Sequence, residues 1–263
     1  MAQDYSNSTL VVIDLQNEFL SDGGHFSITP SSKCALLRNL RNLVPDFRTA
    51  KGKLVWVRSI YANTGTETPA PQHGQTELSS TPGSASHPRL SGTHNGKTQC
   101  CVAGSVNAEF HPDVAALITS EDTIVTKGWY SAFKETSLLD DLRLLQTKNV
   151  YFCGLLSNTC VLATILDAVC FKELETVHVI SDCLGWKYDP SHQNALEKMI
   201  DLGVRITEGA TVIGVGETVS GDPPALARLY YVNGSIPSWR VQLALYEKVR
   251  IEPSRSPLGN PIP

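Results

Sequence analysis

Short apolar runs rich in Val and Ile alternate along the chain with segments in which apolar residues recur at helical spacing. The runs have the length of buried strands and lie at residues 9–14, 53–60, 122–127, 149–154 and 176–181. The periodic segments predict helices over residues 32–50, 111–120, 136–147, 159–173 and 190–203. Strands that alternate with helices form a mostly parallel sheet covered on both faces. The pattern therefore predicts an α/β fold.

Two stretches interrupt this alternation. Residues 62–100 are rich in Gly, Pro, Ser and Thr without periodicity, so we expect a long loop inserted after the second strand. The sequence leaves open whether this loop is a lid or a disordered insertion. Beyond about residue 207 the alternation fades, except for a predicted helix at 237–249. We expect one domain over 1–206, and a C-terminal extension over 207–263 that packs on this domain or on a partner subunit.

Charge and apolar content exclude several classes of protein. The chain has 22 Lys and Arg against 26 Asp and Glu, a formal net charge of −4, and no basic block. A nucleic-acid partner is therefore not expected, whereas a small-molecule substrate is. The N-terminus lacks the pattern of a secretory signal, and no apolar run reaches the roughly 18 residues that span a bilayer. We expect no membrane partner, a cytoplasmic location and a homo-oligomer.

The spacing of the cysteines suggests neither a disulfide framework nor a structural metal site. They are seven in number and include neither a Cys-x-x-Cys pair nor zinc-type spacing. Reduced thiols are the simplest interpretation, and we expect no metal and no cofactor. A free cysteine in an apolar run is most often a small buried residue, and we assign Cys153, Cys170 and Cys183 to that role.

Polar residues at the predicted strand ends are the informative ones, because ligands of an open parallel sheet bind beyond the carboxyl ends of its strands. Asp14, Arg58 and Lys127 lie at such ends, and Cys160 follows the strand at 149–154. Each residue alone also fits a structural role. Asp14 could be a turn residue, Arg58 a member of a surface ion pair, Lys127 a solvated strand end and Cys160 a small core residue. Their joint placement favours convergence in one cleft.

Cys160 lies where a strand passes into a helix. A thiol with a pKa of about 8.5 is mostly neutral at pH 7 and becomes a nucleophile when a base removes its proton or a cation holds the thiolate. Asp14 is a candidate base and Lys127 a candidate cation. The free N–H groups at the start of a helix favour a thiolate and can bind an oxyanion. The sequence therefore points to Cys160 as a nucleophile.

Three segments also carry a family resemblance: VVIDLQNEF (11–19), VTKGWYSAF (125–133) and GLLSNTCVLATILDA (154–168). Together with residues 53–60 and 100–114, they resemble the isochorismatase-like cysteine hydrolases over roughly residues 9–206. The resemblance implies a Rossmann-like three-layer α/β/α sandwich. It also implies that Asp14, Lys127 and Cys160 match the triad of nicotinamidase, N-carbamoylsarcosine amidase, ureidoacrylate hydrolase and biuret hydrolase. A cis peptide between Leu155 and Leu156 and an oxyanion hole formed by the Leu156 and Cys160 N–H groups are implied as well.

Departures from the family pattern concern metal and substrate. Nicotinamidases carry an Asp-x-His metal motif after the second strand, where this chain reads VWVRSIYAN. A catalytic zinc is therefore not expected. The histidines of the inserted loop are His73, His87 and His94, and their spacing is not typical of a metal site. Arg58 is a candidate for holding a substrate carboxylate. Aromatic candidates for the pocket wall are Phe19, Tyr61, Trp129 and Trp186, although an aromatic residue beside a strand end is more often part of the core.

The favoured activity is cleavage of a small amide or ureide at its C–N bond through a thioester on Cys160. Two alternatives stay open. One is an isochorismatase-type vinyl ether hydrolase in which Asp14 protonates the vinyl group and Cys160 is a bystander. The other is a catalytically silent scaffold with the same fold, for which residues 207–263 are the only sequence argument.

Overall fold

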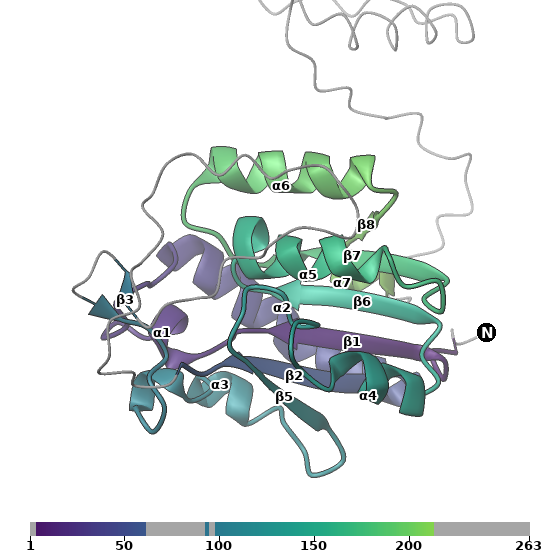
Figure 1. The fold of residues 1–263 in the computed structure, drawn as a ribbon, viewed down its shortest axis with the longest axis horizontal. Coiled ribbons are helices and arrows are strands. Elements are labelled where there is room, and N and C mark those ends of the chain that lie inside the picture. Colours follow the sequence, from purple (N-terminus) through teal and green to yellow (C-terminus); the bar gives the residue numbers. More distant parts are fainter. Residues whose placement is uncertain (1–3, 62–92, 95–97, 213–263) are drawn as a thin grey trace, which may run out of the picture. The chain divides into compact units, whose positions relative to one another are not determined.

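The computed structural model describes residues 4–61, 93–94 and 98–212. Its main sheet has six strands in the order β5-β2-β1-β6-β7-β8, and every neighbouring pair is parallel (Figure 1). The strands are β1 (Ser8–Ile13), β2 (Lys53–Ser59), β5 (Thr123–Lys127), β6 (Asn149–Gly154), β7 (Thr176–Leu184) and β8 (Arg205–Thr207). A separate antiparallel pair consists of β3 (Thr93–His94) and β4 (Thr98–Gln99).

Helices cover both faces of the sheet and make three layers. Figure 1 shows α4 and α5 in front of the sheet and α2 behind it. The helices that contribute to the core on the α2 side are α1 (Asn17–Leu20), α2 (Pro30–Thr49), α3 (Pro112–Ala115) and α7 (Gly209–Val212). Those on the other side are α4 (Leu138–Leu144), α5 (Leu162–Ala168) and α6 (Asp189–Asp201). Two single turns complete the described elements, η1 (Val106–Ala108) and the π-helical η2 (Ser157–Val161). The predicted α/β/α sandwich is confirmed.

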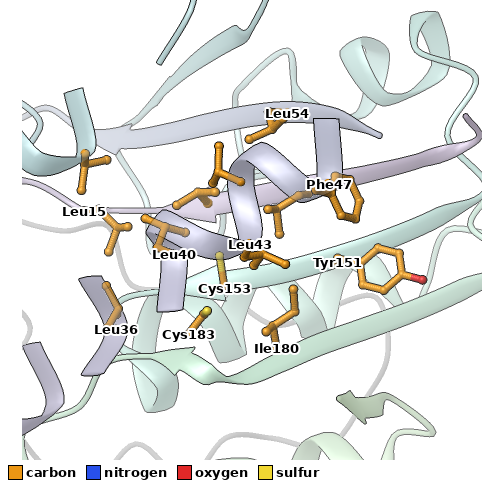
Figure 2. Close-up of a cluster of buried hydrophobic side chains, with 14 of the residues drawn as sticks. Leu15, Leu36, Leu40, Leu43, Phe47, Leu54, Tyr151, Cys153, Ile180 and Cys183 are labelled. Atoms are coloured by element: carbon orange, nitrogen blue, oxygen red, sulfur yellow. The ribbon is translucent and has the colours of Figure 1, made fainter. Parts of the chain in front are cut away.

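Helix α2 shows how the sequence builds one of these layers. Thr29 caps its first turn by accepting a hydrogen bond from the Ser32 N–H, and Pro30 occupies the first helical position, where no N–H partner is needed. Its buried apolar residues recur at helical spacing and form a stripe. In Figure 2 this stripe faces the sheet, with Leu40, Leu43 and Phe47 of the helix close to Cys153, Tyr151 and Ile180 of the strands.

Alternation along β1 explains why its sequence is apolar throughout. Leu10 and Val12 pack in the core beneath α2, whereas Val11 and Ile13 pack in the core on the opposite face. All four side chains are at most 1% exposed. A strand buried on both faces needs a continuous apolar run, so the run itself signalled a central position in the sheet.

The strand register brings the carboxyl ends together. Ile13 of β1 is opposite both Val57 of β2 and Gly154 of β6, and Ser59 of β2 is opposite Lys127 of β5. The residues that follow β1, β2, β5 and β6 therefore meet at a single edge of the sheet, which is where the sequence placed the candidate site.

The structure differs from the sequence expectation in its finer elements. Strand β8 was not predicted, because three residues, of which one is exposed and two have intermediate burial, give too short a pattern. The helix expected over 159–173 is divided into η2 and α5, and the one expected over 111–120 is reduced to α3. Strands β3 and β4 fall inside the segment expected to be a loop. Most of that segment and the predicted helix at 237–249 lie outside the described residues.

Candidate active site

A buried ion pair forms the centre of the site. Lys127 Nζ at the end of β5 lies 2.7 Å from Asp14 Oδ2, and both residues are 1% exposed. Asp14 directly follows β1 with φ of 56°, a left-handed conformation that Asp tolerates better than most residues. Because burying a single charge is costly, each of these groups is stable here only with the other.

Ser59 at the end of β2 joins both charged groups. Its hydroxyl donates to Asp14 Oδ1 at 3.0 Å and accepts from Lys127 Nζ at 2.8 Å. Gln16 fixes Ser59 in turn, since its side chain accepts from the Ser59 N–H and donates to the Ser59 carbonyl, both at 2.8 Å. Lys127 also donates to the Trp129 carbonyl at 3.1 Å. The ends of β1, β2 and β5 are thus connected by a single hydrogen-bond network.

The joint that carries Cys160 depends on a glycine. Gly154 has φ of +114°, and a Cβ atom there would lie 2.1 Å from the Ile13 carbonyl oxygen. No other residue type fits both the backbone conformation and this close approach. The next residue, Leu155, donates its N–H to the same carbonyl at 2.9 Å. The Leu155–Leu156 peptide bond is cis, in agreement with the family resemblance.

Side chains of α5 and α6 hold the turn η2. Thr164 Oγ1 donates to the Cys160 carbonyl at 2.7 Å and accepts from the Ala132 N–H at 3.0 Å. At the start of the turn, Ser157 Oγ lies 3.0 Å from Nδ1 of His192. Cys160 is therefore positioned from both sides of the turn.

The Cys160 thiol interacts with both charged groups of the ion pair. Burial raises the pKa of this thiol; the Lys127 ammonium opposes the rise and the Asp14 carboxylate adds to it. Burial alone would lower the pKa of Lys127, but the charges and hydrogen bonds of Asp14 and Cys160 raise it overall. The raised pKa favours the neutral form of the thiol next to the Asp14–Lys127 ion pair. Such a thiol becomes a nucleophile only when a base takes its proton.

Backbone donors are available next to the thiol. Leu156 precedes η2, and no described group accepts a hydrogen bond from its N–H. The Cys160 N–H lies within the turn itself. These are the two donors that the family resemblance implies for an oxyanion hole.

Two of the predicted pocket residues lie near the triad. Burial, together with the charges of Cys160 and Asp14, raises the pKa of the Tyr61 hydroxyl, while a hydrogen bond with Ser59 opposes the rise. Phe19 of α1 packs against the small core that contains Tyr61. Sequence analysis missed Tyr130, whose pKa is also raised by burial and by the charge of Cys160.

The other predicted substrate-binding residues are placed differently. Arg58 lies between Val57 and Ser59, so its side chain is on the opposite sheet face, where it reaches Glu109 at 3.4 Å and Thr126 at 3.4 Å. The structure therefore does not bring Arg58 to the triad. Trp129 contributes its carbonyl to Lys127, while its ring lies 5.4 Å from Lys134 Nζ.

Trp186 reaches the site through another residue. Its ring stacks on His192 with centroids 4.0 Å apart, and His192 in turn contacts Ser157 of η2. Gln16 and Ser59, which complete the charged network, were not singled out from the sequence, although both are polar residues close to strand ends.

The described residues also contain a group of three possible metal ligands, Glu18, Cys100 and Cys101. Of the loop histidines, His73 and His87 lie outside the described residues, as does the side chain of His94. Among the helices that the structure describes, none is both long and apolar enough to cross a bilayer.

Comparison with known proteins identifies the family. The family model of the isochorismatase domain matches residues 8–211, which is most of the chain. The chain belongs to the isochorismatase family. This family match covers β1 to α7 and includes all three triad residues.

Relatives of this isochorismatase-family chain are distant in sequence. A ureidoacrylate amidohydrolase, RutB, from Cronobacter sakazakii is 24% identical over 163 residues, covering 61% of this chain and 67% of the relative. A probable inactive nicotinamidase from Arabidopsis thaliana is 23% identical over 208 residues, covering 78% and 94%. The structure of a cysteine hydrolase from Pseudomonas syringae superposes with a TM-score of 0.62 at 20% identity, covering 81% and 94%. This last likeness establishes the fold.

Proposed function

We propose that this protein is a cysteine amidohydrolase that cleaves the C–N bond of a small amide or ureide through a thioester on Cys160. The observation that carries the proposal is the contact of a buried thiol with a complete Asp14–Lys127 ion pair at the carboxyl edge of the sheet. The similarity to RutB supports a ureide or a related amide as the substrate class.

In the first half-reaction, Asp14 takes the Cys160 proton as the sulfur attacks the substrate carbonyl. Because burial raises the pKa of the thiol, the proton leaves as the C–S bond forms rather than beforehand. Negative charge passes to the carbonyl oxygen, and the Leu156 and Cys160 N–H groups stabilise it by donating hydrogen bonds. Asp14 then gives the proton to the leaving nitrogen, and the C–N bond breaks to leave the thioester.

In the second half-reaction, water replaces the departed amine. Asp14, again a carboxylate, accepts a proton from this water as its oxygen attacks the thioester carbonyl. The same backbone donors hold the oxyanion, and the thiol regains its proton as the acid leaves. Lys127 stays protonated throughout, since its pKa is raised, and it balances the charge of Asp14 whenever that residue is ionised.

The alternatives predict different roles for Cys160. A vinyl ether hydrolase needs an acid at Asp14 but no thiol, and a silent scaffold needs neither group. The Arabidopsis relative shows that the silent alternative is relevant. What favours catalysis here is that Asp14 and Lys127 are in direct contact and that the buried Cys160 thiol interacts electrostatically with both. The homo-oligomer and the cytoplasmic location remain predictions of the sequence.

The test combines a substrate panel with nucleophile variants. Small primary amides, ureides and isochorismate are offered to the wild-type protein, with detection of ammonia and of product. Cys160→Ala is expected to abolish amide turnover, and intact-mass spectrometry of the wild type during turnover should show the acyl adduct. Cys170→Ser is the control: the sequence assigned this cysteine to the core, but its thiol is exposed, so the variant should behave as wild type. Full turnover by folded Cys160→Ala would refute the thioester route, and turnover of isochorismate alone by this variant would favour ether hydrolysis.

A further inference from the structure

Glu18, Cys100 and Cys101 come together beside the active site although they are far apart in sequence. Glu18 belongs to α1, which follows β1, and the two cysteines follow β4. One carboxylate oxygen and the two sulfur atoms all lie within 4.8 Å of one another. All three residues are buried, at 1%, 7% and 0% exposed respectively. Carboxylate and thiol side chains converging in a protected position are a donor set suited to a divalent metal ion.

The spacing of the sulfurs fits a particular coordination geometry. Cys100 Sγ and Cys101 Sγ are 3.8 Å apart. Two sulfur ligands at a Zn–S distance of about 2.3 Å, at the tetrahedral angle, are about 3.8 Å apart as well. The distance between the two sulfur atoms thus already equals the distance between two sulfur ligands of a tetrahedral zinc site.

The Glu18 carboxylate is oriented by hydrogen bonds and makes no close ion pair with a Lys or Arg among the described residues. Its Oε1 accepts from the His25 N–H at 2.7 Å and lies 3.0 Å from His25 Nδ1, while Oε2 accepts from the Cys101 N–H at 3.2 Å. The Lys187 ammonium lies over the Phe26 ring, 5.1 Å from its centroid, and interacts with Glu18 and Cys100 through its charge without forming an ion pair. A carboxylate has about four lone-pair sites, so these contacts leave Glu18 free to bind a cation.

We propose that Glu18, Cys100 and Cys101 bind one thiophilic divalent cation, for which Zn²⁺ is the probe. Cys100 and Cys101 bind it as thiolates and release their two protons to solvent, and Glu18 supplies an oxygen. Water completes the tetrahedron. His25 is the outer partner that orients the ligating carboxylate, a role that histidine and carboxylate groups commonly fulfil around zinc.

The cation is expected to reinforce one wall of the active site. Cys100 and Cys101 pack with Tyr61 and Ala108 in a small core, and Tyr61 lies beside the triad. A metal ion held between α1 and this core would fix the position of the Tyr61 ring. It has no part in the thioester chemistry, so binding can be measured without a substrate.

The experiment uses Co²⁺ and Zn²⁺ on the full chain, reduced with a phosphine and freed of metal by a chelator. One Co²⁺ per chain is expected to give the sulfur-to-cobalt charge-transfer absorption and the visible bands of a tetrahedral site, and Zn²⁺ should displace it. X-ray absorption at the zinc edge should then count two sulfur ligands. A first shell without sulfur, or absence of the thiolate absorption, would overturn the proposal.

Substitutions locate the ion. Cys100→Ser, Cys101→Ser and Glu18→Gln should each weaken Zn²⁺ binding by more than the roughly 10- to 100-fold that loss of an outer partner costs, and His25→Ala by about that amount. Cys34→Ser, which changes an exposed thiol, is the matched control and should bind normally. Cys160→Ala should also keep the cobalt spectrum. Loss of the spectrum in that variant would assign the ion to the catalytic thiol and refute the site.

Discussion

The Ser59 hydroxyl donates a hydrogen bond of 3.0 Å to Asp14 Oδ1. It also accepts from Lys127, so a single neutral group sets the orientation of both buried charges. In a parallel sheet this arrangement requires β2 to lie between β1 and β5, as the strand order shows. The base of the proposed reaction therefore depends on the strand beside it.

Replacing Ser59 should reduce catalysis more than stability. Ser59→Ala leaves Asp14 Oδ1 without its donor and removes one acceptor of Lys127. An unsatisfied buried group costs about 1–3 kcal/mol, which corresponds to a loss of kcat/KM of roughly 5- to 150-fold if it misplaces the base in the transition state. Steady-state kinetics measures this loss, with circular dichroism to confirm the fold.

Ser137→Ala is the matched control, because Ser137 makes a similar bond of 2.7 Å to a carboxylate, that of Asp141, on the exposed surface. It should leave kcat/KM unchanged. Equal kinetics for Ser59→Ala and the wild type would show that the hydroxyl does not position Asp14.

Gly154 should tolerate no side chain. In Gly154→Ala the new Cβ meets the Ile13 carbonyl and forces the joint before Cys160 to move. Gly104 provides the comparison, since it also has positive φ, of 77°, but has open space around its Cα. Gly104→Ala should lower the free energy of unfolding by about 1 kcal/mol from strain alone. Gly154→Ala should lower it by about 1–3 kcal/mol more from the clash.

Urea unfolding measures both variants in parallel. Equal destabilisation would mean that β6 can move away from β1 without penalty, contrary to the close approach that the structure shows.

His178 should make stability dependent on pH. It is 8% exposed, and burial, assisted by the charge of Arg205, lowers its pKa from 6.5 to about 4. As pH falls, the unfolded chain therefore binds a proton at this residue before the folded protein does. The stabilisation is complete above pH 6.5 and is lost progressively between pH 6.5 and about 4.

The comparison is with His178→Phe, which keeps an aromatic ring for stacking on Tyr151 but cannot titrate. The unfolding free energy of the wild type minus that of the variant should be constant above pH 6.5 and fall as the solution is acidified below it. A difference that does not change with pH would contradict the lowered pKa.

Chelation should not stop hydrolysis. In the proposed mechanism, the triad and the backbone donors supply the nucleophile, the base and the oxyanion contacts without a metal. After exhaustive treatment with EDTA, kcat is expected to equal that of the untreated enzyme. Loss of Zn²⁺ from Glu18 and its two cysteines removes support from the pocket wall only, so its effect is expected in KM. Activity that disappears on chelation and returns with added metal would show that the proposed mechanism lacks a component.

The sequence predicted what depends on strand ends and missed what depends on register. Asp14, Lys127 and Cys160 were found because polar groups after apolar runs meet at one edge of a parallel sheet. Ser59 was missed because its partners are set by which residues of β1, β2 and β5 are opposite one another. The sequence placed Arg58 at the cleft because it identified the end of a strand but not the sheet face on which each side chain lies.

The grouping of Glu18 with Cys100 and Cys101 was beyond the reach of spacing rules. Cysteine patterns predict metal sites when the ligands are close in sequence, whereas here the carboxylate comes from α1 and the thiols from a segment far along the chain. Only the folded arrangement of these segments brings the three side chains together.

Lys127 lies on β5, which pairs only with β2 and ends the described sheet on that side. Terminal strands undergo local opening and exchange their amide hydrogens at a lower free energy than the global unfolding that releases central strands. Lys127 is thus attached to a terminal strand, while its partner Asp14 follows a central one. On heating, activity is therefore expected to disappear before helix content, because opening of β5 alone separates the ammonium from the carboxylate.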